Sequence, residues 1–216
     1  MASQWHRGLA DDVYGVIFNK LMALEIAPGA RITVDVLVRE LEVSQTPIRE
    51  ALGRLEGEGL VVKTHLVGYS ASQQISRQRF DEIYELRLLL EPDGARRAAQ
   101  RISDDQMRRL EDTAEQMRNL DSRERSSYAR FARLDGDLHD AIMAIAGNDL
   151  IRHMLTHLHT HFHIFRLMFH ARVTEEALGE HERILAALAS RDENAADAAM
   201  RDHIWRSHRR LLPAFA

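Results

Sequence analysis

Ser44-Gln-Thr-Pro-Ile-Arg-Glu-Ala-Leu52 is the stretch of sequence that decides the fold of the first third of this chain. Ser44 is a favoured helix N-cap, and Pro47 is tolerated in a first helical turn because the N–H that it lacks has no partner there. The apolar residues recur at helical spacing and predict one buried face, formed by Ile48, Leu52 and Leu55. Gly59 then predicts the end of this helix.

The flanking segments predict the rest of a small domain. Apolar residues over 9–21 recur at helical spacing, and Thr33 is placed to cap a second helix that runs to about residue 41. After the helix at Ser44, residues 60–65 have strand propensity, and 67–70 can return as a second strand. Three helices followed by a hairpin predict a winged helix-turn-helix.

The start of the helix at Ser44 exposes donors suited to base edges and phosphates, namely Gln45, Thr46 and Arg49. The stretch resembles the GntR family of bacterial winged-helix repressors, whose recognition helix commonly reads Ser-Arg-Thr-Pro-Val-Arg-Glu-Ala-Leu. The likeness extends over 26–32, 37–41 and 59–62 and to Gly68. It implies a surface that binds double-stranded DNA, formed by Arg31, Thr33, Ser44, Gln45, Thr46, Arg49, Lys63, His65 and Gly68.

Two residues depart from the family pattern. Gln45 stands where most relatives have arginine, the residue type that binds guanine bidentately. Because glutamine pairs better with adenine, we expect the preferred operator to differ at that step. Asp35 places a negative charge near the start of the second helix, where relatives often contact phosphate.

The composition is that of an ordinary globular protein of 216 residues, 45% hydrophobic and 29% charged, with a formal net charge of −4. Residues 1–75 hold 7 Lys+Arg and 9 Asp+Glu, which argues against nonspecific nucleic-acid binding because that mode needs a broad basic surface. The chain has no cysteine, so disulfides and thiolate metal sites are excluded. It also lacks an apolar run of roughly 20 residues and a signal-peptide core, so we expect a cytoplasmic protein with no membrane partner.

A polar connector near residue 75 predicts two domains, residues 1–74 and 77–216. The second reads as helical throughout, over about 77–101, 103–121, 124–147, 149–171, 174–190 and 192–211. Predicted helix caps and stops are Ser103, Asn148, Thr174 and Gly147. The fold class is therefore mainly α, an N-terminal winged helix-turn-helix plus a C-terminal all-α antiparallel helical bundle.

Four polar residues of the helical half lie on faces that are otherwise apolar: Asp135, His139, His181 and His203. Buried polar groups cost a few kcal/mol unless they are satisfied, and one shared divalent cation would satisfy all four. The alternative is a purely structural role. The chain has 12 histidines, and each of these three could be a hydrogen-bonded core residue.

The order of these residues resembles the effector (FCD) domain of the fatty-acid-regulator branch of the GntR family, in its smaller six-helix variant. Many members bind a metal through an Asp-x-x-x-His pair and two later histidines, which implies Asp135, His139, His181 and His203 as ligands. Three histidines and a carboxylate suit Zn²⁺, Ni²⁺ or Mn²⁺ with positions left open, and the sequence does not choose among them. No nucleophile motif or separate base accompanies the cluster, so we expect binding and not catalysis.

Arg87 is predicted to face inward on its helix, and two interpretations stay open. It can form an ion pair with Glu91, one turn later, or it can bind an effector carboxylate as a fork. Related effector domains often carry an arginine in this context, here Tyr84-Glu-Leu-Arg87, and the resemblance implies the second interpretation.

The segment from His153 to His170 contains six histidines. We interpret its flank of His159, His163, Arg166 and His170 as solvated or subunit-facing. The alternatives are that His159 or Arg166 reaches the effector pocket, which makes Arg166 a second effector-binding candidate, or that the flank titrates as a pH sensor.

These observations predict a homodimeric, ligand-responsive regulator, a repressor that leaves a near-palindromic operator when a small organic acid binds at the metal and Arg87. One alternative is a metal-sensing regulator in which the cation itself is the signal. Another is a metalloenzyme with a fused DNA-binding domain.

Overall fold

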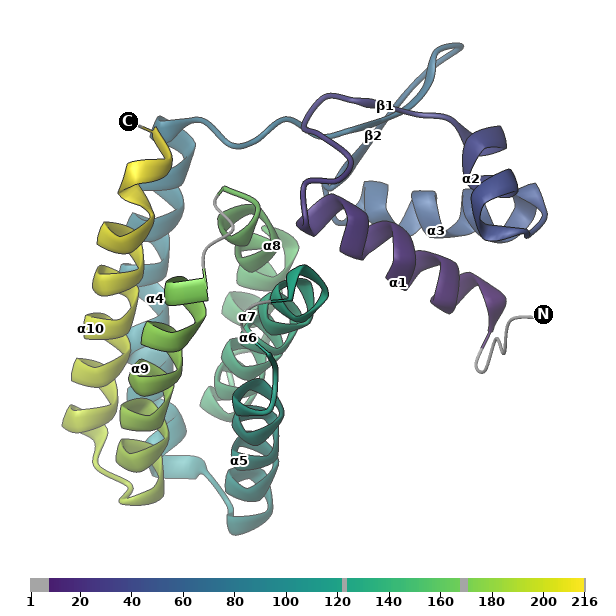
Figure 1. Ribbon diagram of the computed structural model, residues 1–216. Coiled ribbons are helices and arrows are strands. Elements are labelled where there is room, and N and C mark those ends of the chain that lie inside the picture. The colour runs from purple at the N-terminus through teal and green to yellow at the C-terminus, as the bar shows by residue number, and fades with distance from the viewer. Residues whose placement is uncertain (1–7, 122–123, 168–170, 216) are drawn as a thin grey trace. The chain divides into compact units, whose positions relative to one another are not determined.

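The computed structural model describes residues 8–121, 124–167 and 171–215 (Figure 1). The chain divides into two compact units, Met1–Gln74 and Ile75–Ala216. Within the described residues, no helix combines the length and apolarity needed to cross a membrane.

The first unit contains three helices and a small sheet. The helices are α1 (Leu9–Met22), α2 (Val34–Leu41) and α3 (Gln45–Gly57). The strands are β1 (Arg31–Ile32), β2 (Val61–Thr64) and β3 (Gly68–Ala71), and they form an antiparallel sheet in the order β1-β3-β2. This is the predicted winged helix-turn-helix, with the addition of β1, a two-residue strand too short to show a period in the sequence.

Local backbone geometry explains how α3 is presented. Glu42 adopts a left-handed conformation with φ of 55°, which makes the sharp turn between α2 and α3. At the other end, Gly59 has φ of 70°, and the amide of Leu60 donates to the carbonyl of Leu55 at 2.9 Å. This Schellman arrangement ends α3 as the sequence predicts. Ile48, Leu52 and Leu55 are fully buried against α1, so the opposite face of α3 is left outward.

The second unit is a helical bundle. Its helices are α4 (Arg77–Arg101), α5 (Asp104–Arg118), α6 (Arg125–Ala146), α7 (Asp149–His157), α8 (Thr160–Phe165), α9 (Ala171–Ala189) and α10 (Glu193–Leu211), followed by a 3₁₀ turn, η1 (Leu212–Phe215). Helix α10 packs along α4 and α9, and α6 packs against α4, α5 and α8 (Figure 1). The predicted caps Ser103 and Asn148 each accept a backbone N–H, and Gly147 ends α6 with φ of 76°.

Two predictions about the helical half are wrong. The single helix expected over 149–171 is two helices, because His159 adopts a left-handed conformation with φ of 42° and restarts the helical phase. Thr174 is not a cap, since α9 already begins at Ala171. His170 lies outside the described residues.

A close approach between α4 and α6 sets the position of the polar residues discussed below. Gly94 of α4 faces Met143 of α6, and a Cβ atom at Gly94 would collide with the Met143 thioether. The missing side chain lets the two helices pack closely, which brings Glu91 of α4 within hydrogen-bonding distance of His139 of α6.

Candidate functional site

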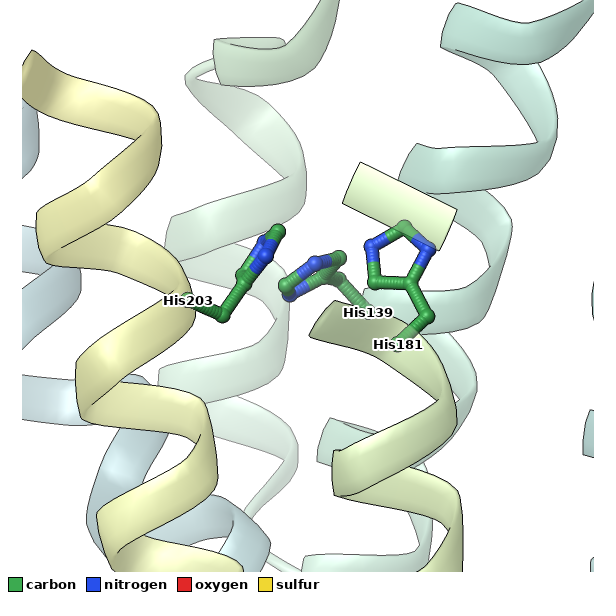
Figure 2. Close-up of side chains that lie close together, drawn as sticks. All are labelled: His139, His181 and His203. Carbon is green, nitrogen blue, oxygen red and sulfur yellow. The ribbon is translucent and has the colours of Figure 1, made fainter. Parts of the chain in front are cut away.

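The structure brings together the four predicted metal-ligand residues in the core of the bundle. Helix α6 supplies Asp135 and His139, α9 supplies His181, and α10 supplies His203, and each residue is at most 4% exposed. Figure 2 shows the three imidazoles gathered side by side. Their ring centroids lie 4.9 to 5.8 Å apart, and one ring nitrogen of each lies within 4.8 Å of the others.

Two buried glutamates orient two of the imidazoles. The Nδ1 atom of His139 lies 2.6 Å from Glu91 Oε2, and that of His203 lies 2.9 Å from Glu180 Oε2. A carboxylate fixes the proton on Nδ1, and the lone pair is then on Nε2. A carboxylate behind an imidazole is the usual support for a metal-binding histidine.

His181 and Asp135 meet without forming a hydrogen bond. His181 Nε2 lies 3.1 Å from Asp135 Oδ1, yet neither ring nitrogen of His181 has a hydrogen-bond partner among the described residues. His139 Nε2 is likewise without a partner there. Ligand atoms about 2.1 Å from one ion and at right angles to each other are roughly 3 Å apart. The donor set of three imidazoles and a carboxylate therefore fits a divalent cation, which would take one nitrogen from each ring, including the unpartnered Nε2 of His139 and one of the two unpartnered nitrogens of His181.

The charge states suit this role. Burial lowers the pKa of His139 to about 4 and that of His203 to about 3, so both rings are neutral near pH 7. Burial would raise the pKa of Asp135, but the neighbouring His161 and His181 hold it well below its usual value. Neutral imidazoles and an ionised carboxylate are the forms that bind metal ions.

Arg87 is buried and paired with Glu91, as the first interpretation of the sequence proposed. Its Nε lies 2.5 Å from Glu91 Oε1, and its Nη2 lies 3.2 Å from Oε2. Burial alone would lower the pKa of Arg87, but the Glu91 carboxylate outweighs it and raises that pKa. Because Glu91 also accepts from His139, one carboxylate connects Arg87 to the histidine cluster.

Two cavities flank the cluster. The larger, about 170 Å³, is lined by residues of α6, α7 and α8 and by Glu91, and it includes His139 and His161. The smaller, about 10 Å³, is lined by Arg87, Asp135, His161 and His203, among others. The other predicted effector residue, Arg166, is buried at the C-terminal end of α8 and lines neither cavity.

Sequence reasoning missed His161 and Glu180 as members of this site. His161 Nδ1 lies 2.6 Å from Asp135 Oδ2, and Asp135, His139 and His161 form a second group that could hold a metal ion. The left-handed break at His159 hid His161, because a continuous helix turns it to another face. Glu180 adjoins His181 in the sequence and supports His203 instead, a pairing that no helical spacing reveals.

The nine predicted DNA-binding residues are all exposed on the first unit. Thr33 and Ser44 are the N-cap residues of α2 and α3, although neither side chain accepts a capping hydrogen bond. Arg31 donates to the backbone oxygen of Val67 at 3.1 Å and so supports the β2–β3 hairpin. Thr46, Lys63, His65 and Gly68 lie on the outward start of α3 and on that hairpin.

Gln45 and Arg49 belong to a chain of hydrogen bonds on this surface. The Gln45 amide donates to Asp35 Oδ1 at 2.9 Å, and Arg49 Nη2 donates to Gln45 Oε1 at 3.3 Å. The two departures from the family pattern, Asp35 and Gln45, therefore contact each other.

Comparison with known families gives two matches that together cover most of the chain. Residues 9–69 match the family described as bacterial regulatory proteins, gntR family. Residues 82–206 match the FCD domain, a domain known to bind metal ions.

Named relatives and solved structures agree with these matches. The Nta operon transcriptional regulator of Aminobacter aminovorans is 29% identical over 187 residues, which cover 86% of each chain. The HTH-type transcriptional repressor RspR of Escherichia coli is 29% identical over 194 residues, 89% of this chain and 84% of that one. Among solved structures, E. coli McbR/YncC has a TM-score of 0.72 at 19% identity, covering 98% of this chain and all of that one. A GntR regulator from Rhodococcus sp. RHA1 has a TM-score of 0.71 at 19% identity, covering 97% of this chain and all of that one, and these two structures show the fold alone.

We predict that the purified protein carries about one divalent ion per chain and that His181→Ala or His203→Ala lowers this occupancy. An ion that binds only the folded state at a hundredfold excess over its Kd stabilises by about 3 kcal/mol, so the melting temperature should fall by roughly 5–10 °C when the ion is lost. Elemental analysis and thermal melts measure both effects, and His153→Ala, an exposed histidine of α7, is the matched control.

The prediction is contradicted if elemental analysis finds no metal and Zn²⁺, Ni²⁺ and Mn²⁺ all leave the melting temperature unchanged. It is also contradicted if the His153→Ala control loses as much metal as the two core variants.

Proposed function

This chain belongs to the GntR family of bacterial regulatory proteins and carries an FCD domain, and we propose that it is a homodimeric repressor that a small organic acid releases from its operator. Its family membership makes it a DNA-binding transcriptional regulator and not an enzyme. The FCD domain takes a small-molecule effector, and the metal centre proposed here is Asp135, His139, His181 and His203. The observation that carries the proposal is the group of buried imidazole nitrogens of His139 and His181 that have no hydrogen-bond partner among the described residues, with His139 also lining a cavity of about 170 Å³.

The metal would supply a Lewis-acidic position for an oxygen ligand. The surrounding residues would orient the ligands and adjust the charge of the site. Glu91 and Glu180 orient two of the imidazoles, and Asp135 adds one negative charge. Three neutral imidazoles and one carboxylate leave a divalent ion with a net positive charge, which favours an anionic effector. Which of Zn²⁺, Ni²⁺ or Mn²⁺ binds depends on the coordination geometry and on the availability of each metal as well as on the four ligands.

The size of the cavity limits the effector. A cavity of 150 Å³ in another protein holds benzene, so about 170 Å³ accommodates a compact acid and excludes a long acyl chain unless the helices move. Arg87 is proposed as the second anchor of the carboxylate. Since Arg87 is already paired with Glu91 beside a cavity of only about 10 Å³, the acid must compete with Glu91 for it.

On the DNA side, we propose that α3 enters the major groove and that two copies read a near-palindromic operator. Gln45, Thr46 and Arg49 lie on the exposed start of α3, and Lys63, His65 and Gly68 on the hairpin beside it. Arg31, Thr33 and Ser44 complete the proposed surface. A regulator in which the metal itself is the signal remains a second candidate, because the metal-ligand cluster is buried among the same helices that would respond to an acid.

Arg49→Ala is predicted to weaken specific operator binding by at least about tenfold, because it removes a forked donor worth 1–3 kcal/mol of base discrimination from each half-site. Mobility-shift titrations at moderate salt measure the effect. Arg109→Ala removes the same charge from an exposed position on α5 and serves as the control. Equal affinity of the Arg49→Ala variant and wild type would show that α3 does not read the operator.

We also predict that the acids that stabilise the protein in a thermal-shift screen are anionic, and that they bind Arg87→Ala at least about tenfold more weakly because a charge-assisted fork is lost. Arg97→Ala on the same helix, which breaks an exposed pair with Asp93, is the control. Chelator-treated protein should also bind the same acids more weakly, because the metal that would coordinate their carboxylate is gone. A neutral or cationic best ligand, or an acid that binds all four samples equally, would refute the pocket.

A further inference from the structure

His161 connects the two cavities to the proposed metal centre. Its side chain is 16% exposed, and its Nδ1 lies 2.6 Å from Asp135 Oδ2. The other oxygen of Asp135 faces His181 at 3.1 Å. The carboxylate therefore uses one oxygen toward the histidine cluster and the other toward His161. His161 stands behind Asp135 as Glu91 stands behind His139.

His161 is also the one residue that lines both cavities among the lining residues described. Arg87 lines the smaller cavity and not the larger one. On this arrangement, an acid in the larger cavity would reach Arg87 past the His161 ring, which is part of the wall of both cavities. The ring therefore forms a partition between the space that admits a ligand and the arginine proposed to bind it.

Helix α8, which carries His161, is suited to transmit such a displacement. It has only six residues, and it begins after the left-handed His159, whose backbone conformation costs about 1–3 kcal/mol for a non-glycine residue. Thr160 and Phe162, the neighbours of His161, line the larger cavity as well. A ligand in that cavity thus contacts α8 directly.

We propose that His161 is a positioning residue with two roles. It holds Asp135 at the metal, and it closes the route from the larger cavity to Arg87. An acid in the larger cavity would then act on the metal centre by displacing the His161 ring. The inference rests on the proposed metal centre and on no property of the operator. It assigns His161 to the outer sphere of the ion, in contrast to the four proposed ligands.

The test uses Co²⁺ as a spectroscopic probe ion and benzoate as a compact carboxylate in full-length protein. His161→Ala should still bind one Co²⁺ per chain but with a Kd about 10- to 100-fold higher, as is typical when an outer-sphere partner is lost. His161→Asn should recover most of that affinity, since its amide nitrogen takes the place of Nδ1. In His161→Ala, benzoate should change the Co²⁺ visible spectrum at a concentration at least tenfold lower than in wild type, because the partition is gone.

His163→Ala is the matched control, since His163 lies on α8 and lines neither cavity. The inference is overturned if His161→Ala binds Co²⁺ and responds to benzoate as wild type does. It is overturned in another way if His161→Ala loses Co²⁺ as completely as His181→Ala, because His161 would then be a ligand. Failure of wild type to bind Co²⁺ would instead refute the metal centre and this inference with it.

A second inference concerns the DNA-binding surface and rests on the proposed role of α3. Recognition of adenine by glutamine requires both the amide donor and the amide acceptor. In the structure the Gln45 donor is bound to Asp35 and the Gln45 acceptor is bound to Arg49. These two bonds leave one N–H and one oxygen lone pair of the amide unused, but they fix the orientation of Gln45 and place it to support Arg49. That Gln45 reads adenine stays a prediction, and in this arrangement Gln45 supports Arg49.

We infer that Asp35 is a specificity-determining residue that acts through Gln45, because its negative charge is repelled by the DNA phosphates and does not bind them. Asp35→Ala would remove the bond that fixes the Gln45 amide, whose second N–H and second oxygen lone pair could then pair with adenine. Selection of operators from a random DNA library with full-length protein tests this idea. Asp35→Ala should enrich adenine about fivefold or more at one position of each half-site, the low end of what a bidentate pair discriminates.

Glu56→Ala, which removes an exposed acid near the end of α3, gives the same change of charge and should leave the base preference unchanged. Identical preferences for wild type and Asp35→Ala would overturn the inference. If wild type enriches no sequence at all, the proposed placement of α3 fails instead.

Discussion

Burial of imidazole nitrogens without hydrogen-bond partners is the constraint on which the proposed function of the helical unit depends. Where α6, α9 and α10 meet, His139 and His181 hold three buried nitrogens for which the described residues offer no hydrogen-bond partner. A buried polar group without a partner costs a few kcal/mol, so a stable fold needs something at this point. A divalent cation would bind one nitrogen of each ring, and Asp135 would reduce its net charge.

The residues around the histidine cluster hold the proposed metal ligands in place. Glu91 and Glu180 fix the rings of His139 and His203, and Arg87 compensates the charge of Glu91 in the same low-dielectric core. His161 supports Asp135 from α8. The proposed centre is thus connected to α4 through one carboxylate and to a cavity wall through one imidazole. Any ligand that changes either contact changes the metal environment, which is what an effector domain requires.

How much the sequence could predict depended on helical continuity. Asp135 and His139 were found because α6 runs unbroken and the i, i+4 rule holds along it. His161 was missed because the left-handed His159 shifts the phase of α8, and no proline or glycine marks that break. The winged helix-turn-helix was predicted from caps and spacing, except for β1, whose two residues carry no pattern. The contact between Asp35 and Gln45 joins two helices and has no periodic signal.

X-ray absorption at the zinc K-edge of the zinc-loaded protein tests the central claim most directly, because it reads the ligands of the ion without any assumption about effector or operator. The account predicts a first shell of nitrogen and oxygen at about 2.0–2.2 Å with outer-shell scattering from three imidazole rings. A shell of oxygen alone, or scattering from a single imidazole, would place the ion on surface residues and contradict a centre built from Asp135, His139, His181 and His203.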